Sequence, residues 1–150
     1  MPDHDLLAEL EAEIGIMMRR VRRVLAERAQ AVDPELPSLG YSILLYLAYA
    51  GPQRASQIVD TFGTDKGAVS RQVQLLQELG FVTRKPDSRD RRAALLELSS
   101  SAAERLNRVG TERREVLAER LGDWKPGELE NFVSLLHRYN SSLDAGASGA

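Results

Sequence analysis

The stretch of residues 64–98 constrains the fold of this chain more than any other. Its first half predicts an amphipathic helix, because apolar residues recur at spacings of four and three, at Val69, Val73 and Leu76. Thr64 or Asp65 can cap the start of this helix. Gly80 can end it. The opposite side of the helix carries small, hydrogen-bonding or cationic groups, which are Gly67, Ala68, Ser70, Arg71 and Gln74.

Two short apolar segments follow this helix and predict a pair of strands joined by a charged loop. The segments read FVTRK and AALLEL, and the loop between them reads PDSRDRR. The span from Arg84 to Arg92 contains five cations and two carboxylates, a net charge of about +3. A helix with a small polar face followed by a cationic hairpin is typical of a winged helix-turn-helix, which binds double-stranded DNA.

The residues before this stretch also show the apolar periodicity of helices. It predicts helices over residues 3–31, 39–50 and 54–62, with Ser38 capping the second of them. Two prolines separate the first two helices, because proline cannot continue a helix. The short third helix and the helix after it have the order of a helix-turn-helix, with glycine in the turn.

Two further helices are expected after the predicted hairpin. The first begins at Ser99 or Ser101, and Ser101 with Glu104 fits a capping box. The second covers residues 128–143, with Pro126 in a first helical position.

The fold class is therefore mainly α with a small β-wing (α+β), a winged helix-turn-helix flanked by long terminal helices. The predicted regions are an N-terminal dimerisation helix (1–36), the winged helix-turn-helix (37–98), the C-terminal helices (99–143) and a disordered tail (144–150).

The run DSRDRRAALLELS, preceded by GAVSRQVQLLQELGFVTR, resembles the MarR family of bacterial transcription regulators. The most specific part is the wing, where that family carries an Asp-x-Arg or Asp-Arg-Arg signature between two strands, closing on Leu-Thr or Leu-Ser. The resemblance extends over roughly residues 6–143. A departure is Ala102, where many members have glycine. The resemblance implies a homodimeric, sequence-specific DNA-binding regulator, expected to be a repressor on a pseudo-palindromic operator.

On the predicted recognition helix, Arg71 is the best candidate for a bidentate contact to guanine. Gln74 can reach a base or a phosphate, whereas Lys66 and Ser70 suit phosphate positioning. The absence of bulk at Gly67 and Ala68 lets the backbone approach the groove.

On the predicted wing, Asp90 and Arg92 lie two residues apart and would project to the same side of an extended segment. The carboxylate would then hold the guanidinium in one rotamer, aimed into a narrow minor groove. The resemblance implies that role for Arg92, with Arg89 and Arg91 supporting it. Arg84 and Lys85 at the end of the first strand would contact phosphates.

The terminal helices carry apolar stripes that predict contact with a second copy of the chain. The expected interface residues are Leu7, Leu10, Ile14, Leu129, Phe132, Leu136 and Tyr139. Many MarR-like proteins bind a small aromatic or amphipathic effector between these helices and the DNA-reading part. By that resemblance, an effector pocket would involve Met17, Arg20, Tyr41 and Leu45.

Composition bounds the remaining classes of function. The net charge of −2 does not exclude DNA binding, because phosphates respond to local charge within about 10 Å. Cysteine is absent, and no apolar run approaches the roughly 18 residues of a membrane span, which fits a cytoplasmic protein. His4 and His137 have no metal-ligand spacing, and no catalytic motif is present, so we expect neither an enzyme nor a cofactor. The alternatives are a winged-helix protein-interaction module and an architectural DNA binder without an effector.

Overall fold

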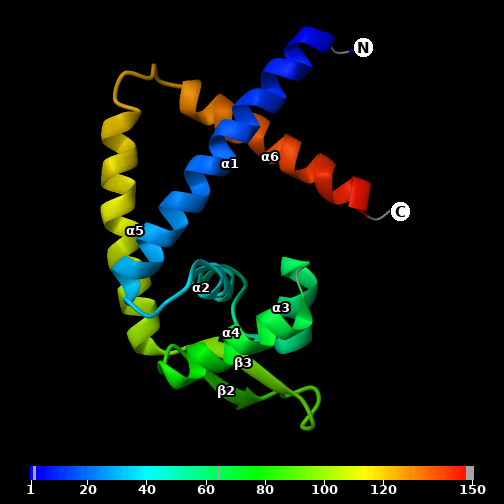
Figure 1. Ribbon diagram of the computed structural model, residues 1–150, viewed down its shortest axis with the longest axis vertical. Coiled ribbons are helices and arrows are strands. Elements are labelled where there is room, and N and C mark those ends of the chain that lie inside the picture. Colours follow the sequence, from blue (N-terminus) through cyan, green and yellow to red (C-terminus); the bar gives the residue numbers. More distant parts are fainter. Residues whose placement is uncertain (2, 64, 148–150) are drawn as a thin grey trace. The chain divides into compact units, whose positions relative to one another are not determined.

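The computed structural model describes residues 1, 3–63 and 65–147, with only the backbone given for 145–147 (Figure 1). Six helices and a three-stranded sheet account for most of the described residues, which confirms the predicted fold class. No helix in these ranges is long and apolar enough to cross a membrane. The elements are α1 (His4–Val32), α2 (Ser38–Ala50), β1 (Gln53–Arg54), α3 (Ala55–Phe62), α4 (Lys66–Glu78), β2 (Val82–Pro86), β3 (Ala94–Leu98), α5 (Ser100–Arg120) and α6 (Glu128–Ala147).

The chain divides into two compact units, Met1–Thr111 and Glu112–Ala150. The first unit contains the hydrophobic core, and α2 is the most buried of its helices. The fully buried side chains of α2 include Tyr41, Ile43 and Leu44, at 0–1% exposure. Around them pack residues from the other elements of this unit, among them Ala29, Ile58, Val69, Val73, Leu76, Phe81, Leu96 and Leu106. Each large apolar side chain buried in this way stabilises the fold by about 1.5–3 kcal/mol.

The ends of α4 are fixed by its own sequence, as predicted. The Asp65 carboxylate accepts a hydrogen bond from the Gly67 N–H at 3.0 Å and caps the helix. The alternative cap at position 64 lies outside the described residues. Beyond the helix, Gly80 has φ +74°, and the Phe81 N–H donates to the Leu76 carbonyl at 2.8 Å. This left-handed turn ends α4 and directs the chain into β2.

The predicted cap of α2 is wrong, and of the two caps predicted for α5 the structure has Ser99. Ser38 is the first residue of α2 rather than its cap, because the Pro37 carbonyl already accepts the Tyr41 N–H at 3.0 Å. Before α5, Ser99 is the capping residue, since its hydroxyl accepts the Ala102 N–H at 3.1 Å. The capping box based on Ser101 is therefore wrong, because position 101 already lies inside the first turn of α5.

α6 begins at Glu128, as predicted, but the role of Pro126 and the end of the helix differ from the prediction. Pro126 and Gly127 form a turn closed by the Glu128 N–H and the Lys125 carbonyl at 3.1 Å, and Gly127 has φ +88°. The helix consequently begins at Glu128, and Pro126 is not in its first position. At the other end α6 continues to Ala147, where the sequence pattern predicted a tail from residue 144. No proline interrupts this extension, so its backbone can continue the helix. The rest of the predicted tail, 148–150, lies outside the described residues.

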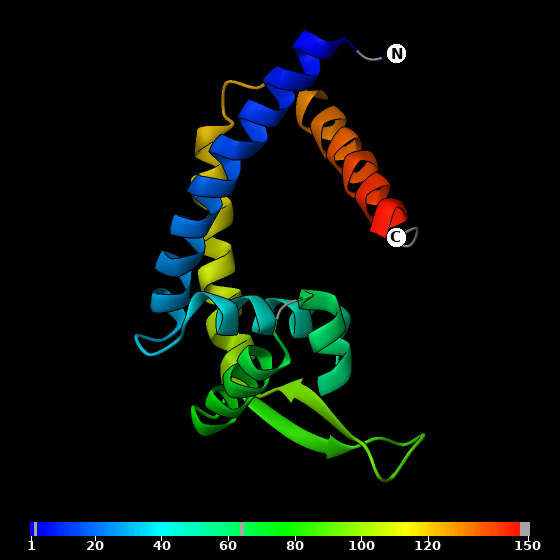
Figure 2. The same ribbon diagram turned by 45° about the vertical axis from the view of Figure 1, so that its right-hand side comes forward.

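The sheet has the strand order β1-β3-β2, and both pairings are antiparallel. The predicted hairpin is present, with Val82 opposite Leu98 and Pro86 opposite Ala94. The sequence did not predict β1, whose two residues pair with Leu96 and Leu95 of β3. Figure 2 shows β2 and β3 extending together away from the helices and ending in the loop that forms the tip of the wing.

Candidate nucleic-acid interface

The outer face of α4 consists of polar and cationic side chains. Lys66, Ser70, Arg71 and Gln74 are exposed, whereas Gly67 and Ala68 are half-buried. The other face of the helix is the buried stripe of Val69, Val73 and Leu76, as the periodicity predicted. α3 precedes α4 through a turn at Gly63, whose φ of +56° suits glycine. This is the arrangement of a helix-turn-helix, with α4 in the position of the recognition helix.

Arg71 lies one helical turn after Gly67, and its guanidinium folds back over that glycine. A methyl group added at Gly67 would stand 3.2 Å from Arg71 Nη1. The missing side chain at position 67 therefore leaves room for the arginine at the start of the helix. Among the described residues Arg71 has neither an ion pair nor a hydrogen bond, so its donors are available to a ligand.

The structure brings α4 and β2 together at a shallow pocket of about 350 Å³. Ser70 and Gln74 of α4 line it with Arg84 of β2. Gln74 also donates to the Glu78 carboxylate at 3.1 Å, so its amide is partly engaged along its own helix. Three of the residues expected to contact DNA thus form one surface.

The loop of the wing is folded by two carboxylates, each of which accepts the backbone N–H two residues further on. Asp87 Oδ1 accepts from Arg89 at 2.9 Å, and Asp90 Oδ1 accepts from Arg92 at 3.0 Å. Residues 90–92 form a turn, so the extended geometry predicted for Asp90 and Arg92 is wrong. Asp90 orients the Arg92 backbone instead of pairing with its guanidinium, because an aspartate readily closes this local turn.

The cations of the wing differ in how they are held. Arg89, Arg91 and Arg92 are exposed, and in the described part of the chain none of them makes an ion pair. Lys85 is paired with Glu97 at 2.8 Å, which offsets part of its charge. The net positive charge predicted for the wing is therefore concentrated at its tip.

The buried carboxylate at the base of the wing was not predicted as a functional group. Asp87 is only 6% exposed. Its Oδ2 accepts from Arg54 Nε at 2.9 Å and from Arg54 Nη2 at 2.6 Å. The N–H of Arg89 and then the guanidinium of Arg54 hold the pKa of Asp87 below its ordinary value. The only signal in the sequence was the Asp-x-Arg spacing after Pro86, and it did not point to the partner 33 residues away.

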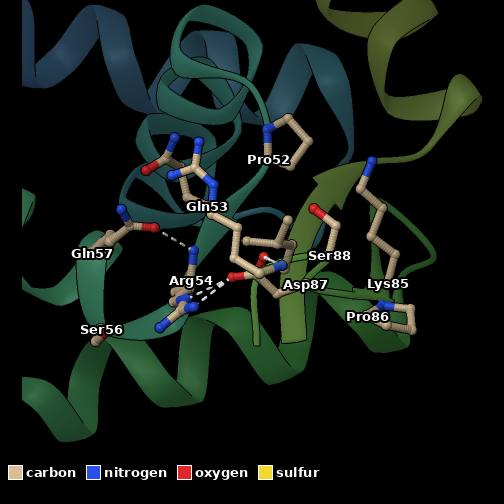
Figure 3. A pocket seen from close by; sticks show the side chains of 11 residues that line it. Pro52, Gln53, Arg54, Ser56, Gln57, Lys85, Pro86, Asp87 and Ser88 are labelled. Atoms are coloured by element: carbon tan, nitrogen blue, oxygen red, sulfur yellow. Dashed lines mark hydrogen bonds and ion pairs between the residues drawn. The ribbon is translucent and has the colours of Figure 1, made fainter. Parts of the chain in front are cut away.

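A polar hollow of about 740 Å³ surrounds this ion pair (Figure 3). One side is formed by residues around β1 and the start of α3, including Arg54, Ser56 and Gln57. The other side is formed by the end of β2 and the wing, including Lys85 and Ser88. Both Arg54 and Lys85 are already bound by carboxylates, so the hollow does not present them as free cations.

The residues expected at a dimer interface are largely exposed in the single chain. On α1, Leu7 and Leu10 are 39% and 45% exposed, and Ile14 is half-buried. On α6, Leu129 and Phe132 are 46% and 47% exposed. Leu136 and Tyr139 are half-buried.

Met17 and Arg20 line a groove of about 250 Å³ along α1. This groove does not include Tyr41 or Leu45, the other two residues expected at an effector pocket. Tyr41 is 1% exposed and belongs to the core, and Leu45 packs against that core.

These features define a class of protein: the fold and the exposed cationic surface are those of a winged helix-turn-helix DNA-binding protein. Comparison with known proteins shows which family the chain resembles. The model of the MarR family matches residues 36–93, from the end of the α1–α2 connection to the wing. Together with the relatives below, this match shows that the chain is similar to the MarR family of transcription regulators.

The relatives extend the similarity to most of the chain. NicR of Pseudomonas putida, an HTH-type transcriptional repressor, is 25% identical over 132 residues, which are 87% of this chain and 84% of NicR. YxaD of Bacillus subtilis, an HTH-type transcriptional regulator, is 26% identical over 134 residues, which are 89% of this chain and 92% of YxaD. The crystal structure of wild-type MarR from E. coli, in its apo form, has the same fold, with a TM-score of 0.68 and 20% identity over 87% of this chain and 95% of that one.

Proposed function

We propose that this protein is a cytoplasmic homodimeric repressor that binds a pseudo-palindromic operator and is released from it by a small effector. The observation that carries the proposal is the combination of an exposed cationic surface on α4 and the wing with exposed apolar stripes on α1 and α6. The first suits a groove of duplex DNA, and the second suits a second copy of the chain.

The apolar stripes support the dimer. Exposed leucines and phenylalanines at helical spacing would remain in contact with water in a monomer, although burial contributes about 25 cal/mol per Å² of apolar surface. The second half of α5 adds Val116 and Leu117, at 45% and 50% exposure. In a two-fold symmetric dimer, the stripes of both subunits would be buried in the same interface. The two recognition helices would then lie about one turn of DNA apart, near 34–36 Å.

The repressor role is supported by a relative, and the effector is supported by a groove on α1. NicR, which is similar over most of the chain, is a transcriptional repressor. The groove beside Met17 and Arg20 combines apolar and cationic groups, which suits a small aromatic or amphipathic acid. In the dimer, the partner chain would close this groove further.

The dimer is tested by placing a charge on the α1 stripe. Leu10→Glu should lower dimerisation and operator affinity together, and removal of residues 3–20 should do so more strongly. Ala12→Glu is the matched control, because position 12 lies on the opposite face of α1 and is also exposed. Sedimentation and DNA binding are measured on the same samples. A monomeric Leu10→Glu protein with full operator affinity would refute the two-fold arrangement.

A further inference from the structure

The wing loop is joined to the rest of the first unit by a single side-chain pair. Among the hydrogen bonds and ion pairs of the described residues, only those between Arg54 and Asp87 connect a side chain of residues 87–93 to a residue outside the β2–β3 hairpin. All other bonds of the loop close on the loop itself or on its own strands. In the described part of the chain, this pair is therefore the one polar side-chain contact that holds the wing loop from the side.

The partner in this pair is fixed to the helix-turn-helix. Arg54 is the last residue of β1 and immediately precedes α3. Its N–H donates to Gln57 Oε1 at 2.8 Å, a bond within the first turn of α3 that Figure 3 shows beside the ion pair. Because α3 packs against α4 through the core, the position of Arg54 follows the position of the recognition helix.

Asp87 transmits that position to the wing. One oxygen is held by Arg54, and the other accepts the N–H of Arg89. The Asp87 N–H donates to the Ala93 carbonyl at 3.1 Å, where the loop returns to β3. The side chain and backbone of Asp87 thus connect the helix-turn-helix to both ends of the loop that carries the wing cations.

A two-stranded ribbon twists readily and is only marginally stable without further support. β1 supports this ribbon at only two positions of β3, so the outer part of the hairpin depends on the pair. If α4 and the wing contact the same DNA duplex, the distance and angle between them must match the duplex. Binding geometry of this kind has to be held to within about 0.5 Å and 10–20°. A small rotation at the base of the wing produces a larger displacement at its tip.

We propose that Arg54 and Asp87 are positioning residues that fix the angle of the wing relative to α3 and α4, and thereby set the spacing between the major-groove and wing contacts. The inference rests on the proposed DNA-binding function and adds two residues that determine specificity without contacting a base. It predicts that loss of the pair lowers the preference for operator over unrelated DNA more than it lowers DNA binding in general.

Asp87→Asn is the decisive variant, because it removes a negative charge near the DNA. Electrostatics alone would make it bind every duplex more tightly. If the pair positions the wing, Asp87→Asn should instead lose about tenfold in the ratio of operator to scrambled-DNA affinity. Arg54→Met should lose a similar factor, and the double variant should be no worse than either single one, since all three lack the same interaction. Asp60→Asn is the control, because it removes an exposed carboxylate of α3.

A second measurement examines the wing without DNA. The chain contains no cysteine, so Arg91→Cys gives one nitroxide position at the wing tip of each subunit. The label should be more mobile in combination with Asp87→Asn or Arg54→Met, and unchanged with Asp60→Asn. Melting curves identify any variant that is simply unfolded, and Arg54→Lys, which retains the charge, should recover part of the restraint.

The outcomes separate the two proposals. Unchanged label mobility, or an Asp87→Asn protein with the same operator preference as Asp60→Asn, would refute the positioning role. A wild-type protein that does not prefer its operator would refute the proposed function, and the mobility measurement would still decide whether the pair restrains the wing. A lower operator preference with a mobile wing tip and a normal melting curve would support the inference.

Discussion

Arg71 offers a quantitative test of how α4 reads DNA. It is exposed, and in the described part of the chain it has no ion pair or hydrogen bond whose loss would disturb the fold. Substitution should therefore change stability by no more than about 0.5 kcal/mol. A bidentate contact to guanine contributes about 1–3 kcal/mol of discrimination, which corresponds to roughly 5- to 140-fold for one half-site.

Arg71→Lys is the informative change, because lysine keeps the charge and loses the fork of two donors. We expect it to lose this discrimination at one base pair per half-site while the salt dependence of binding is retained. Arg71→Ala should lose the same discrimination, and its salt slope should also fall by about 1 for each contact.

The assay is fluorescence anisotropy with operator duplexes in which each base pair is varied in turn, at several salt concentrations. Arg84→Lys is the matched control, since Arg84 is expected to contact phosphate and its substitution by lysine should leave base preference unchanged. If the Arg71→Lys protein kept the wild-type preference at every base pair, Arg71 would not be a residue that reads a base directly.

Three further predictions concern the wing and the fold. Arg92→Ala should weaken operator binding by about tenfold at matched salt without changing the melting curve, and equal affinity would argue against the wing contact. Gly40→Ala should destabilise the protein by about 1–3 kcal/mol in denaturant titrations, because the added methyl would stand 2.9 Å from Leu36 Cδ1. Gly15→Ala is the control and should be neutral or stabilising, because the nearest side-chain atom to the added methyl is Arg19 Nη1 at 3.6 Å. The pKa of Asp87 is lower in the folded protein than in the unfolded chain, so its ionised carboxylate stabilises the fold above the unfolded-state pKa and loses that effect as pH falls through the folded-state pKa. The difference in free energy of unfolding between wild type and Asp87→Asn should therefore shrink below about pH 4. A difference that stays constant with pH would contradict this role of Asp87.

Much of the DNA-reading unit could be predicted because its signals are local. The stripe of α4, its cap at Asp65 and its stop at Gly80 are each encoded within a few residues. The hairpin follows from two short apolar segments around a charged loop. Such features depend on residues close together in the chain, so they can be recognised without knowledge of the fold.

The features that were missed depend on distant parts of the chain or on the exact turn. β1 has only two residues, too few to show a pattern, and exists because β3 passes beside it. Arg54 and Asp87 are brought together by that pairing across 33 residues. The role of Asp90 was predicted wrongly because a spacing of two residues places side chains together in a strand, but places a carboxylate on a backbone N–H in a turn.

The central claim is that this surface binds a specific DNA sequence. It is tested most directly by a salt titration of binding to the DNA upstream of the protein's own coding sequence, compared with a scrambled duplex. We expect the native duplex to be preferred by at least about 4 kcal/mol, with both affinities falling as salt rises. Equal affinity for the two duplexes would indicate an architectural DNA binder, and no binding to either at low salt would indicate a protein-interaction module. Either result would contradict the proposed regulator.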